Sequence, residues 1–222
     1  MAAFPTDPGR YSREWLASSY YFPPGPPIRA GRNYDNDTLC LITPYKKADR
    51  MTDILVETYQ DLEPEGLPVI VDMTACVGGN TISFARDRRV AHVHAYETNR
   101  LWYSYLISNI GAYGLSDRVT LYDYSSLECP QRVYTDSIVF IDPLWDHLDP
   151  DHNLMLGDQN VEDVIDRLWQ PTAADPGALV IALKVPPGYH LRRHQSTLYE
   201  IDNPDSSKRR KAKIWMHVLT RP

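Results

Sequence analysis

Cysteine and uninterrupted apolar sequence are both scarce in this chain of 222 residues. Its three cysteines, Cys40, Cys76 and Cys129, are odd in number and widely spaced. That pattern excludes a disulfide framework and a zinc site of ordinary spacing, and it favours a reducing compartment. No run approaches the roughly 18 apolar residues of a membrane span, and no cationic-then-apolar signal opens the sequence. We therefore expect an intracellular protein of the nucleus, the cytoplasm or a viral compartment, not secreted and without a membrane partner.

Positive charge is also in short supply. The chain has 23 lysines and arginines against 29 aspartates and glutamates, so its net charge is −6. This balance excludes a global electrostatic signature of nucleic-acid binding, and such a partner would need a local basic patch. One basic run exists, Lys208-Arg-Arg-Lys-Ala-Lys213, which is either a solvated turn or a clamp for phosphates. The length predicts one principal domain, and a monomer is compatible with the sequence.

The first 40 residues differ in composition from the rest of the chain. The stretch Phe22-Pro-Pro-Gly-Pro-Pro27 cannot form a helix or a central strand, so we expect it to run extended over the surface. Residues 1–40 are predicted to be a partly helical, proline-rich extension outside the core, preceding a single domain at residues 41–222. A helix from Thr43 to about residue 62 opens that domain, with Thr43 as its cap and Pro44 in its first position.

Strands and helices alternate from residue 68 onward. Apolar runs predict strands at 68–72, 91–96, 119–122, 137–141 and 179–183, helical spacing predicts helices at 80–87, 99–113 and 161–169, and 142–159 reads as a polar loop. The last segments, 196–201 and 213–219, read as an antiparallel pair. This order predicts an α/β fold: a doubly wound seven-stranded sheet, mostly parallel, with a terminal antiparallel strand pair.

The loop after the first predicted strand is the most informative stretch. The strand ends in Asp72, passes through Thr74, Ala75 and two glycines, and opens into a helix at Asn80. The glycines would let the backbone approach a ligand, and the helix start offers free N–H groups. In a doubly wound sheet this loop lies in the crevice at the carboxyl ends of the strands.

Acids follow the next strands in the same crevice. Glu97, with Thr98 beside it, ends the second strand and is placed to accept hydrogen bonds from ribose hydroxyls. Asp123 follows the third strand and is placed to accept from an adenine amine, with Tyr124 as a ring wall. The series favours S-adenosylmethionine over a dinucleotide. The candidate cofactor-binding residues are Thr43, Pro44, Asp72, Thr74, Ala75, Gly78, Asn80, Glu97, Thr98, Asp123 and Tyr124.

The fourth strand leads into Asp142-Pro-Leu-Trp145, the candidate reaction centre. A strand-end acid followed by proline makes a rigid corner, after which the tryptophan projects into the crevice. In methyl transfer to an exocyclic amine, the acid and nearby carbonyls can accept the amine hydrogens, while Trp145 stacks on a planar base. A structural turn with a core tryptophan is the alternative. The candidate catalytic residues are Asp142, Pro143, Trp145 and Lys184.

These residues carry a family resemblance that spans roughly residues 11–219. The chain resembles class I S-adenosylmethionine-dependent methyltransferases, and specifically the RNA cap guanine methyltransferases of the trimethylguanosine synthase family. The matching stretches are Leu41–Pro44, Asp72–Ala85, Asn109–Leu115, Asp142–Trp145 and Glu200–Asp202. The resemblance implies a Rossmann-like fold, S-adenosylmethionine as cofactor, a capped RNA 5′ end as substrate, and Trp145 stacked on 7-methylguanine.

The chain departs from that family at three positions. Cys76 stands where glycine is usual and narrows the loop, Leu144 replaces a second proline, and Asp142 replaces a serine. These departures leave open a third class of function, a non-catalytic RNA-binding or scaffold domain with a decayed cofactor loop.

Lys184, just after the predicted fifth strand, supports a second enzymatic reading. Ribose 2′-O-methyltransferases carry a Lys-Asp-Lys-Glu set that Asp142 and Lys184, with Lys46 or Lys47 and Glu200, would complete. The alternative for Lys184 is a solvent-facing or phosphate-facing lysine. No metal site is expected, since the acids and histidines of the loop at 145–152 lack ligand spacing.

Overall fold

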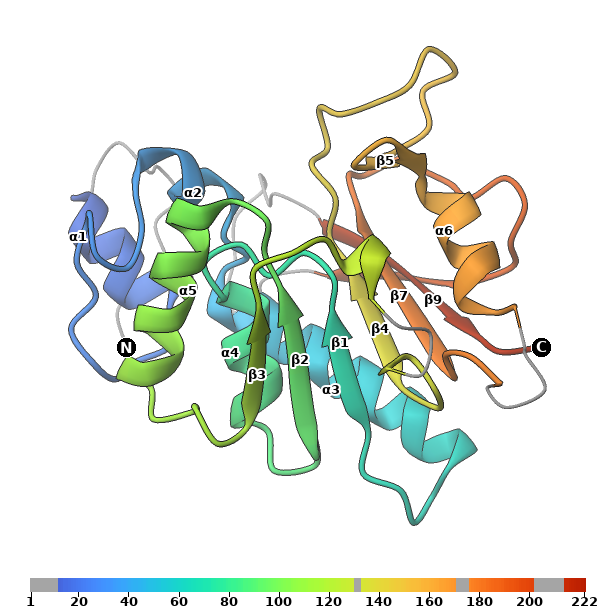
Figure 1. Ribbon diagram of the computed structural model, residues 1–222, viewed down its shortest axis with the longest axis horizontal. Helices are drawn as coiled ribbons and strands as arrows, with labels where there is room; N and C mark the ends of the chain where they lie inside the picture. Colours follow the sequence, from blue (N-terminus) through green and yellow to red (C-terminus); the bar gives the residue numbers. More distant parts are fainter. Residues whose placement is uncertain (1–11, 130–132, 171–175, 202–213) are drawn as a thin grey trace.

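A seven-stranded sheet forms the centre of the computed structural model, which describes residues 12–129, 133–170, 176–201 and 214–222 (Figure 1). The strand order is β3-β2-β1-β4-β7-β9-β8. The strands are β1 (Val69–Asp72), β2 (His92–Tyr96), β3 (Val119–Tyr122), β4 (Ile138–Ile141), β7 (Val180–Val185), β8 (Thr197–Ile201) and β9 (Ile214–Thr220). The first five in the spatial order are parallel, and β9 is antiparallel to β7 and β8. The predicted fold class is therefore confirmed.

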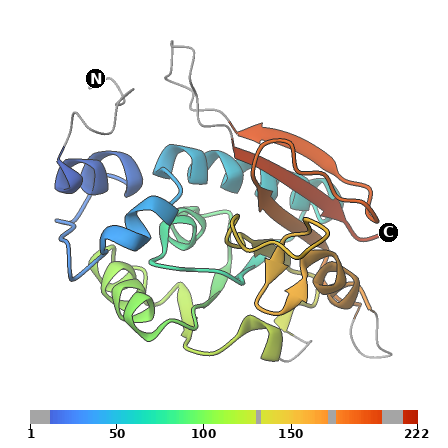
Figure 2. The same ribbon diagram turned by 90° about the horizontal axis from the view of Figure 1, so that it is seen from above.

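Helices cover both faces of this sheet. They are α1 (Arg13–Leu16), which continues as the π-helix η2 (Ala17–Tyr21), then α2 (Asn36–Leu41), α3 (Tyr45–Leu62), α4 (Gly79–Arg86), α5 (Arg100–Ala112), the 3₁₀ turn η3 (Ser126–Glu128) and α6 (Val161–Leu168). Side chains of α3, α4 and α5 form one core cluster, whereas α6 builds a second cluster on the other face. Figure 2 shows α3 and α6 on opposite sides of the sheet. Buried strands flanked by amphipathic helices explain the near-continuous apolar runs in the sequence.

The strand order reverses between β1 and β4, the two strands that precede the loops of interest. In open α/β sheets a ligand crevice lies outside the carboxyl ends of the strands at such a reversal. The segment predicted as a polar loop after β4 also contains a short hairpin, β5 (Met155–Leu156) and β6 (Gln159–Asn160). Figure 1 shows this hairpin at the edge of the sheet where the carboxyl end of β4 lies.

The described part of the N-terminal segment, from residue 12 onward, contributes to the core, whereas the sequence predicted an extension outside it. The side chains of Phe22 and Tyr34 are 0% and 1% exposed, respectively, and both belong to the cluster that includes α3, α4 and α5. The prolines at positions 23–27 exclude a helix or a central strand there, but they do not prevent the aromatic residues on either side from being buried. The proposed division at residues 40 and 41 falls inside α2 and stays a prediction.

The start of α3 differs from the prediction by one position. Pro44 is the N-cap and not the first helical residue, and no side chain caps the helix. Thr43 uses its hydroxyl to accept a hydrogen bond from Lys184. Among the described residues, the helices are all too short or too polar to cross a membrane. The basic run at 208–213 lies outside the described residues.

Candidate active site

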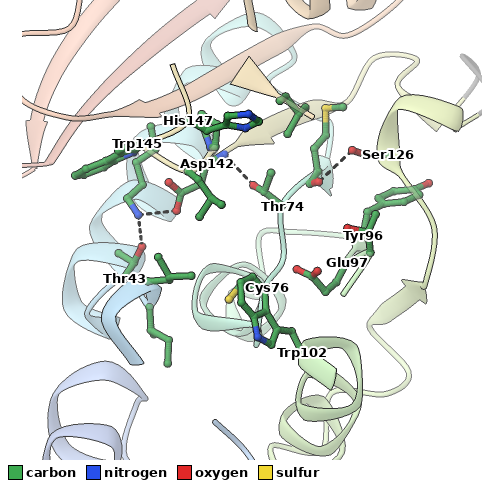
Figure 3. A pocket seen from close by; sticks show the side chains of 18 of the residues that line it. Thr43, Thr74, Cys76, Tyr96, Glu97, Trp102, Ser126, Asp142, Trp145 and His147 are labelled. Carbon is green, nitrogen blue, oxygen red and sulfur yellow. Dashed lines mark hydrogen bonds and ion pairs between the residues drawn. The ribbon is translucent and has the colours of Figure 1, made fainter. Parts of the chain in front are cut away.

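A cavity of about 660 Å³ opens at the carboxyl ends of β1, β2 and β4, beside β7 (Figure 3). Ten of the predicted site residues line it: Thr43, Pro44, Thr74, Glu97, Thr98, Tyr124, Asp142, Pro143, Trp145 and Lys184. Five others, Asp72, Ala75, Gly78, Asn80 and Asp123, do not line it. In Figure 3, Asp142 and Trp145 lie on one side of the cavity, and Glu97 and Tyr96 lie on the other.

A buried ion pair occupies the β4 side of the cavity. The ammonium of Lys184 donates to Asp142 Oδ2 at 2.6 Å and to Thr43 Oγ1 at 2.7 Å. Lys184 lies within β7 and is 4% exposed, so its predicted place after the strand and the solvent-facing alternative are both wrong. Burial raises the pKa of the Asp142 carboxyl, and the Lys184 ammonium opposes that effect. Because a charge at this depth needs a partner, the pair holds Asp142 in one position.

The corner at Asp142 is fixed from the backbone as well. The amide of Asp142 donates to Thr74 Oγ1 at 2.8 Å, which ties the end of β4 to the loop after β1. Trp145 is half-buried and packs against both core clusters. Its ring centroid is 5.4 Å from the Lys184 ammonium, and its indole Nε1 is buried without a hydrogen-bond partner.

The β2 side of the cavity presents one carboxylate and several rings. Glu97 directly follows β2, is 9% exposed, and accepts a hydrogen bond from the amide of Asn99 at 2.7 Å. Burial raises the pKa of its carboxyl, and the backbone amides oppose this. Tyr96, Trp102 and Tyr124 complete this wall. The wall therefore combines a hydrogen-bond acceptor with flat apolar surfaces, which suits a nucleoside.

Asp123 differs from its predicted role. Its side chain is exposed and does not line the cavity, although the next residue, Tyr124, does. The prediction placed every strand-end acid in the crevice, but the direction of a side chain after a strand depends on the loop conformation. Asp123 is therefore not among the residues that the structure brings together.

The glycines of the loop after β1 serve packing. Gly78 has a φ of +94°, and a Cβ there would lie 2.8 Å from Leu106 Cδ1. A Cβ at Gly79 would lie 2.8 Å from Ile42 Cγ2. These positions need glycine because α5 and the segment before α3 approach closely. Met73, Thr74 and Cys76 of this loop line the cavity, and the φ of Cys76, +50°, is also left-handed.

Asp72 lies beneath this loop and is inaccessible to solvent. Thr81 Oγ1 donates to its Oδ2 at 2.6 Å, and the amide of Thr74 donates to its Oδ1 at 3.2 Å. Burial dominates these contacts and raises the pKa of the carboxyl to about 7. Asp72 thus holds the loop after β1 through Thr74 and the start of α4 through Thr81, and its carboxyl titrates near neutrality.

This raised pKa gives a pH-dependent stability. The folded state keeps the Asp72 proton up to about pH 7, whereas the unfolded chain releases it near its ordinary value of 3.8. The free energy of unfolding should therefore fall as pH rises from about 4 to about 7, by at most about 4 kcal/mol from this group. Urea unfolding at pH 4.5 and pH 8 should show a smaller fall for Asp72→Asn than for the wild type. Parallel curves for the two proteins would contradict this assignment.

Several cavity-lining residues were not predicted from the sequence. They come from the N-terminal segment, the start of α5 and the hairpin region: Tyr20, Tyr21, Cys40, Trp102, His147 and Met155. Trp102 follows Glu97 closely enough to have been inferred, but Tyr20 and Tyr21 have no sequence signal that places them here. The Lys-Asp-Lys-Glu set of ribose 2′-O-methyltransferases also requires Lys46 or Lys47 and Glu200. Lys47 is buried and lines the cavity, whereas Lys46 and the exposed Glu200 do not line it.

Histidines, cysteines and acids do not gather into a metal site in the part of the chain that the structure describes. Asp149, from the loop where such a site was weighed, accepts hydrogen bonds from the amides of Asp151 and Asn153. Its carboxylate therefore organises the loop itself.

Comparisons with known proteins support the fold. No family model matches the sequence. A relative, uncharacterised protein L320 of Acanthamoeba polyphaga mimivirus, is 37% identical over 91 residues, and the match spans 35% of this chain and 30% of that protein. Among solved structures, a SAM-dependent methyltransferase from Agrobacterium tumefaciens has a TM-score of 0.54 at 11% identity, over 79% of this chain and 62% of that one. The METTL16 methyltransferase domain has a TM-score of 0.54 at 11% identity, over 75% and 65%. The chain therefore has the Rossmann-like fold of the class I methyltransferases.

Proposed function

We propose that this protein is an S-adenosylmethionine-dependent RNA methyltransferase that methylates the exocyclic amine of a 7-methylguanosine cap. One observation carries the proposal. A single cavity holds a rigid acid–proline corner and a tryptophan on one side and a strand-end carboxylate with aromatic walls on the other. The sequence resemblance to cap guanine methyltransferases supports the choice of substrate, and the fold shared with methyltransferases supports the reaction class.

The β2 side of the cavity fits the cofactor. Glu97 offers a carboxylate to ribose hydroxyls, and Trp102 and Tyr124 offer ring surfaces for adenine. The volume of about 660 Å³ lies within the usual range for ligand pockets of about 300–1,000 Å³. When bound, S-adenosylmethionine supplies an electrophilic methyl group.

The β4 side fits a planar base that carries an amine. Trp145 provides a face for stacking, and Asp142 Oδ1 remains available because both Lys184 and Asn80 approach Oδ2. When one of the amine hydrogens is bonded to Asp142, the lone pair of the amine nitrogen points away from the carboxylate and into the cavity. When the methyl group passes from the cofactor's sulfur to the amine nitrogen, the carbon–sulfur bond would break and the sulfur would leave as a neutral thioether. Asp142 would accept the proton that the nitrogen then releases. Desolvation and alignment are the main requirements of such a transfer.

Calorimetry followed by product mapping tests this function. The protein should bind S-adenosylmethionine and its demethylated product, and it should transfer a methyl group to the guanine amine of capped RNA. Failure to bind either molecule at millimolar concentration would favour the non-catalytic reading. Transfer to any other atom would reject the cap-amine assignment while keeping the enzyme class.

A ribose 2′-O-methyltransferase is the second candidate, and the Asp142–Lys184 contact favours it. The pair is buried, and Lys47 lines the same cavity. Glu200, however, is exposed and lies outside the cavity, so the four-residue set is incomplete. Because Lys184 is also the counter-ion of Asp142, its substitution would disturb either reaction. Mapping the methylated atom is therefore the measurement that separates the two candidates.

Replacing Cys76 should strengthen cofactor binding. Cys76 holds a left-handed backbone conformation that costs a residue with a Cβ about 1 kcal/mol, and its side chain lines the cavity. Burial raises the pKa of its thiol to about 12, so the side chain acts as neutral bulk. Cys76→Gly should raise both the unfolding free energy and the affinity for S-adenosylmethionine, the affinity by up to about tenfold.

Cys76→Ala is the matched control, because it removes the sulfur but keeps the Cβ. If calorimetry shows the same gain in affinity for Cys76→Ala as for Cys76→Gly, the volume of the sulfur is the cause. An additional gain for Cys76→Gly over Cys76→Ala measures the contribution of the strained backbone. Weaker binding for Cys76→Gly would show that the cysteine contributes to the cofactor site.

A further inference from the structure

A second groove lies outside the active site, between the loop that precedes α2 and the outer face of α5. Its volume is about 480 Å³. Arg29 and Arg32 line it from the loop, and Ile107, Ser108 and Gly111 line it from the helix. Figure 1 shows that the loop passes beside α5.

The two arginines give this groove an unbalanced positive charge. Both are exposed, and neither guanidinium makes a hydrogen bond or ion pair with the described residues. In a chain with a net charge of −6, two unpaired arginines at one groove form a local positive site. Guanidinium groups are suited to phosphate because their N–H donors match two oxygens at once.

The loop that carries the arginines is held rigidly by buried amides. Asn33 Oδ1 accepts from the amide of Arg29 at 2.9 Å, and Asn33 Nδ2 donates to Asn109 Oδ1 of α5 at 2.6 Å. Asn109 Nδ2 in turn donates to the carbonyl of Val77, in the loop after β1, at 2.7 Å. Asn33 and Asn109 are 2% and 0% exposed, respectively. A turn fixed in this way loses little conformational entropy on binding.

The groove and the active-site cavity lie along the same helix. Trp102, in the first turn of α5, lines the cavity, and Ile107 to Ala112 line the groove. At about 1.5 Å of rise per residue, the two are separated by roughly 8–15 Å along the helix axis. Arg100, also exposed, begins α5 two residues before Trp102. A few nucleotides of an extended strand can bridge this interval.

We propose that this groove binds backbone phosphates of a single-stranded RNA whose 5′ end occupies the active-site cavity. The inference rests on the proposed function, since it takes RNA as the substrate. Arg29 and Arg32 contact the phosphates, and the half-exposed Ile107 contacts sugar or base surface. The groove adds affinity for the strand and leaves the choice of methylated atom to the cavity.

Removing both arginines tests the proposal without any methylation assay. The probe is a fluorescent, capped single-stranded RNA of about ten nucleotides, within the ~4–16 typical of single-strand sites. Fluorescence anisotropy should show about tenfold weaker binding for the Arg29→Ala/Arg32→Ala variant. The slope of log affinity against log salt should fall by about 1.4, for two lost phosphate contacts. Binding of a cap dinucleotide should stay unchanged.

Gly111 offers a matched pair of variants. A Cβ at Gly111 meets no atom within 4 Å, so side chains there enter the groove without disturbing the core. Gly111→Glu should weaken RNA binding more than Gly111→Gln, because the two differ in charge and hardly in size. Equal effects would reject an anion in the groove.

Other outcomes overturn the proposal specifically. If the slope of log affinity against log salt is unchanged in the Arg29→Ala/Arg32→Ala variant, the arginines make no phosphate contacts. If the variant loses affinity for the cap dinucleotide as much as for the longer RNA, the arginines act on the ligand in the active-site cavity instead. Competition by inorganic pyrophosphate at low millimolar concentration, with no preference for RNA, would indicate a site for free phosphates. Since RNA affinity is measured without cofactor, arginine-dependent RNA binding by a protein that fails to methylate caps would reject only the proposed function.

Discussion

Asp142→Asn should lower the rate constant for methyl transfer by about 10²–10³-fold, the usual loss when one preorganised polar group at the reacting centre is removed. Asparagine keeps the shape of the corner at Pro143 but loses the carboxylate that orients the amine and accepts its proton. The affinity for S-adenosylmethionine should change much less, because Glu97 and the aromatic wall lie on the other side of the cavity. Single-turnover kinetics and calorimetry separate the two quantities.

The same substitution should also destabilise the fold. Lys184 would keep a buried ammonium without its carboxylate, and breaking a buried pair from one side costs about 3–5 kcal/mol. The double variant Asp142→Asn/Lys184→Met removes both charges and should recover most of that stability without recovering activity. Recovery of activity with stability would show that Asp142 acts only through folding. Unchanged stability in the single variant would show that the pair is not stabilising the protein.

Trp145→Ala should produce the largest loss of substrate binding. Stacking of a base on an aromatic side chain contributes about 1–3 kcal/mol, so the KM for capped RNA should rise by about 10–100-fold while the cofactor affinity stays close to that of the wild type. Because Trp145 packs against both core clusters, thermal unfolding of the variant must be measured alongside the kinetics. A loss of stability without a change in KM would assign this tryptophan to the core.

Trp145→Phe is the control for this prediction. Phenylalanine keeps a ring for stacking and removes the buried indole N–H that has no partner. If that N–H faces only protein, the variant should be as stable as the wild type or more so. If the N–H donates to the base, KM should rise by about fivefold, in line with about 1 kcal/mol for one neutral hydrogen bond.

Local patterns were sufficient for most of the fold. The strands predicted before Asp72, Glu97 and Asp142 match β1, β2 and β4 to within about one residue. The runs before Asp72 and Asp142 are apolar because those strands are largely buried, whereas β2 carries the half-buried His92 and His94. The alternation of strands and helices then predicted a parallel sheet whose strand ends share one edge. Glu97 and Asp142 were placed correctly for that reason.

Contacts between distant segments could not be inferred in this way. Lys184 donates to Thr43, 141 residues earlier in the chain, and nothing in either local sequence indicates the other. Phe22 and Tyr34 fall in the stretch that was predicted to lie outside the core because of its prolines, yet both fill the core. Asp123 has the same strand-end signal as Glu97 but points elsewhere, since the loop after β3 sets its direction.

By itself, the sequence determined the order of elements, the edge of the sheet where the cavity lies and two of the acids that line it, Glu97 and Asp142, because periodicity and strand ends are local properties of the chain. Only the tertiary structure decided which charged groups form ion pairs and which glycines are needed for close packing. It also decided that Arg29 and Arg32 have no partner among the described residues. Those outcomes depend on burial and on distances between residues far apart in sequence, and they exist only once the chain has packed.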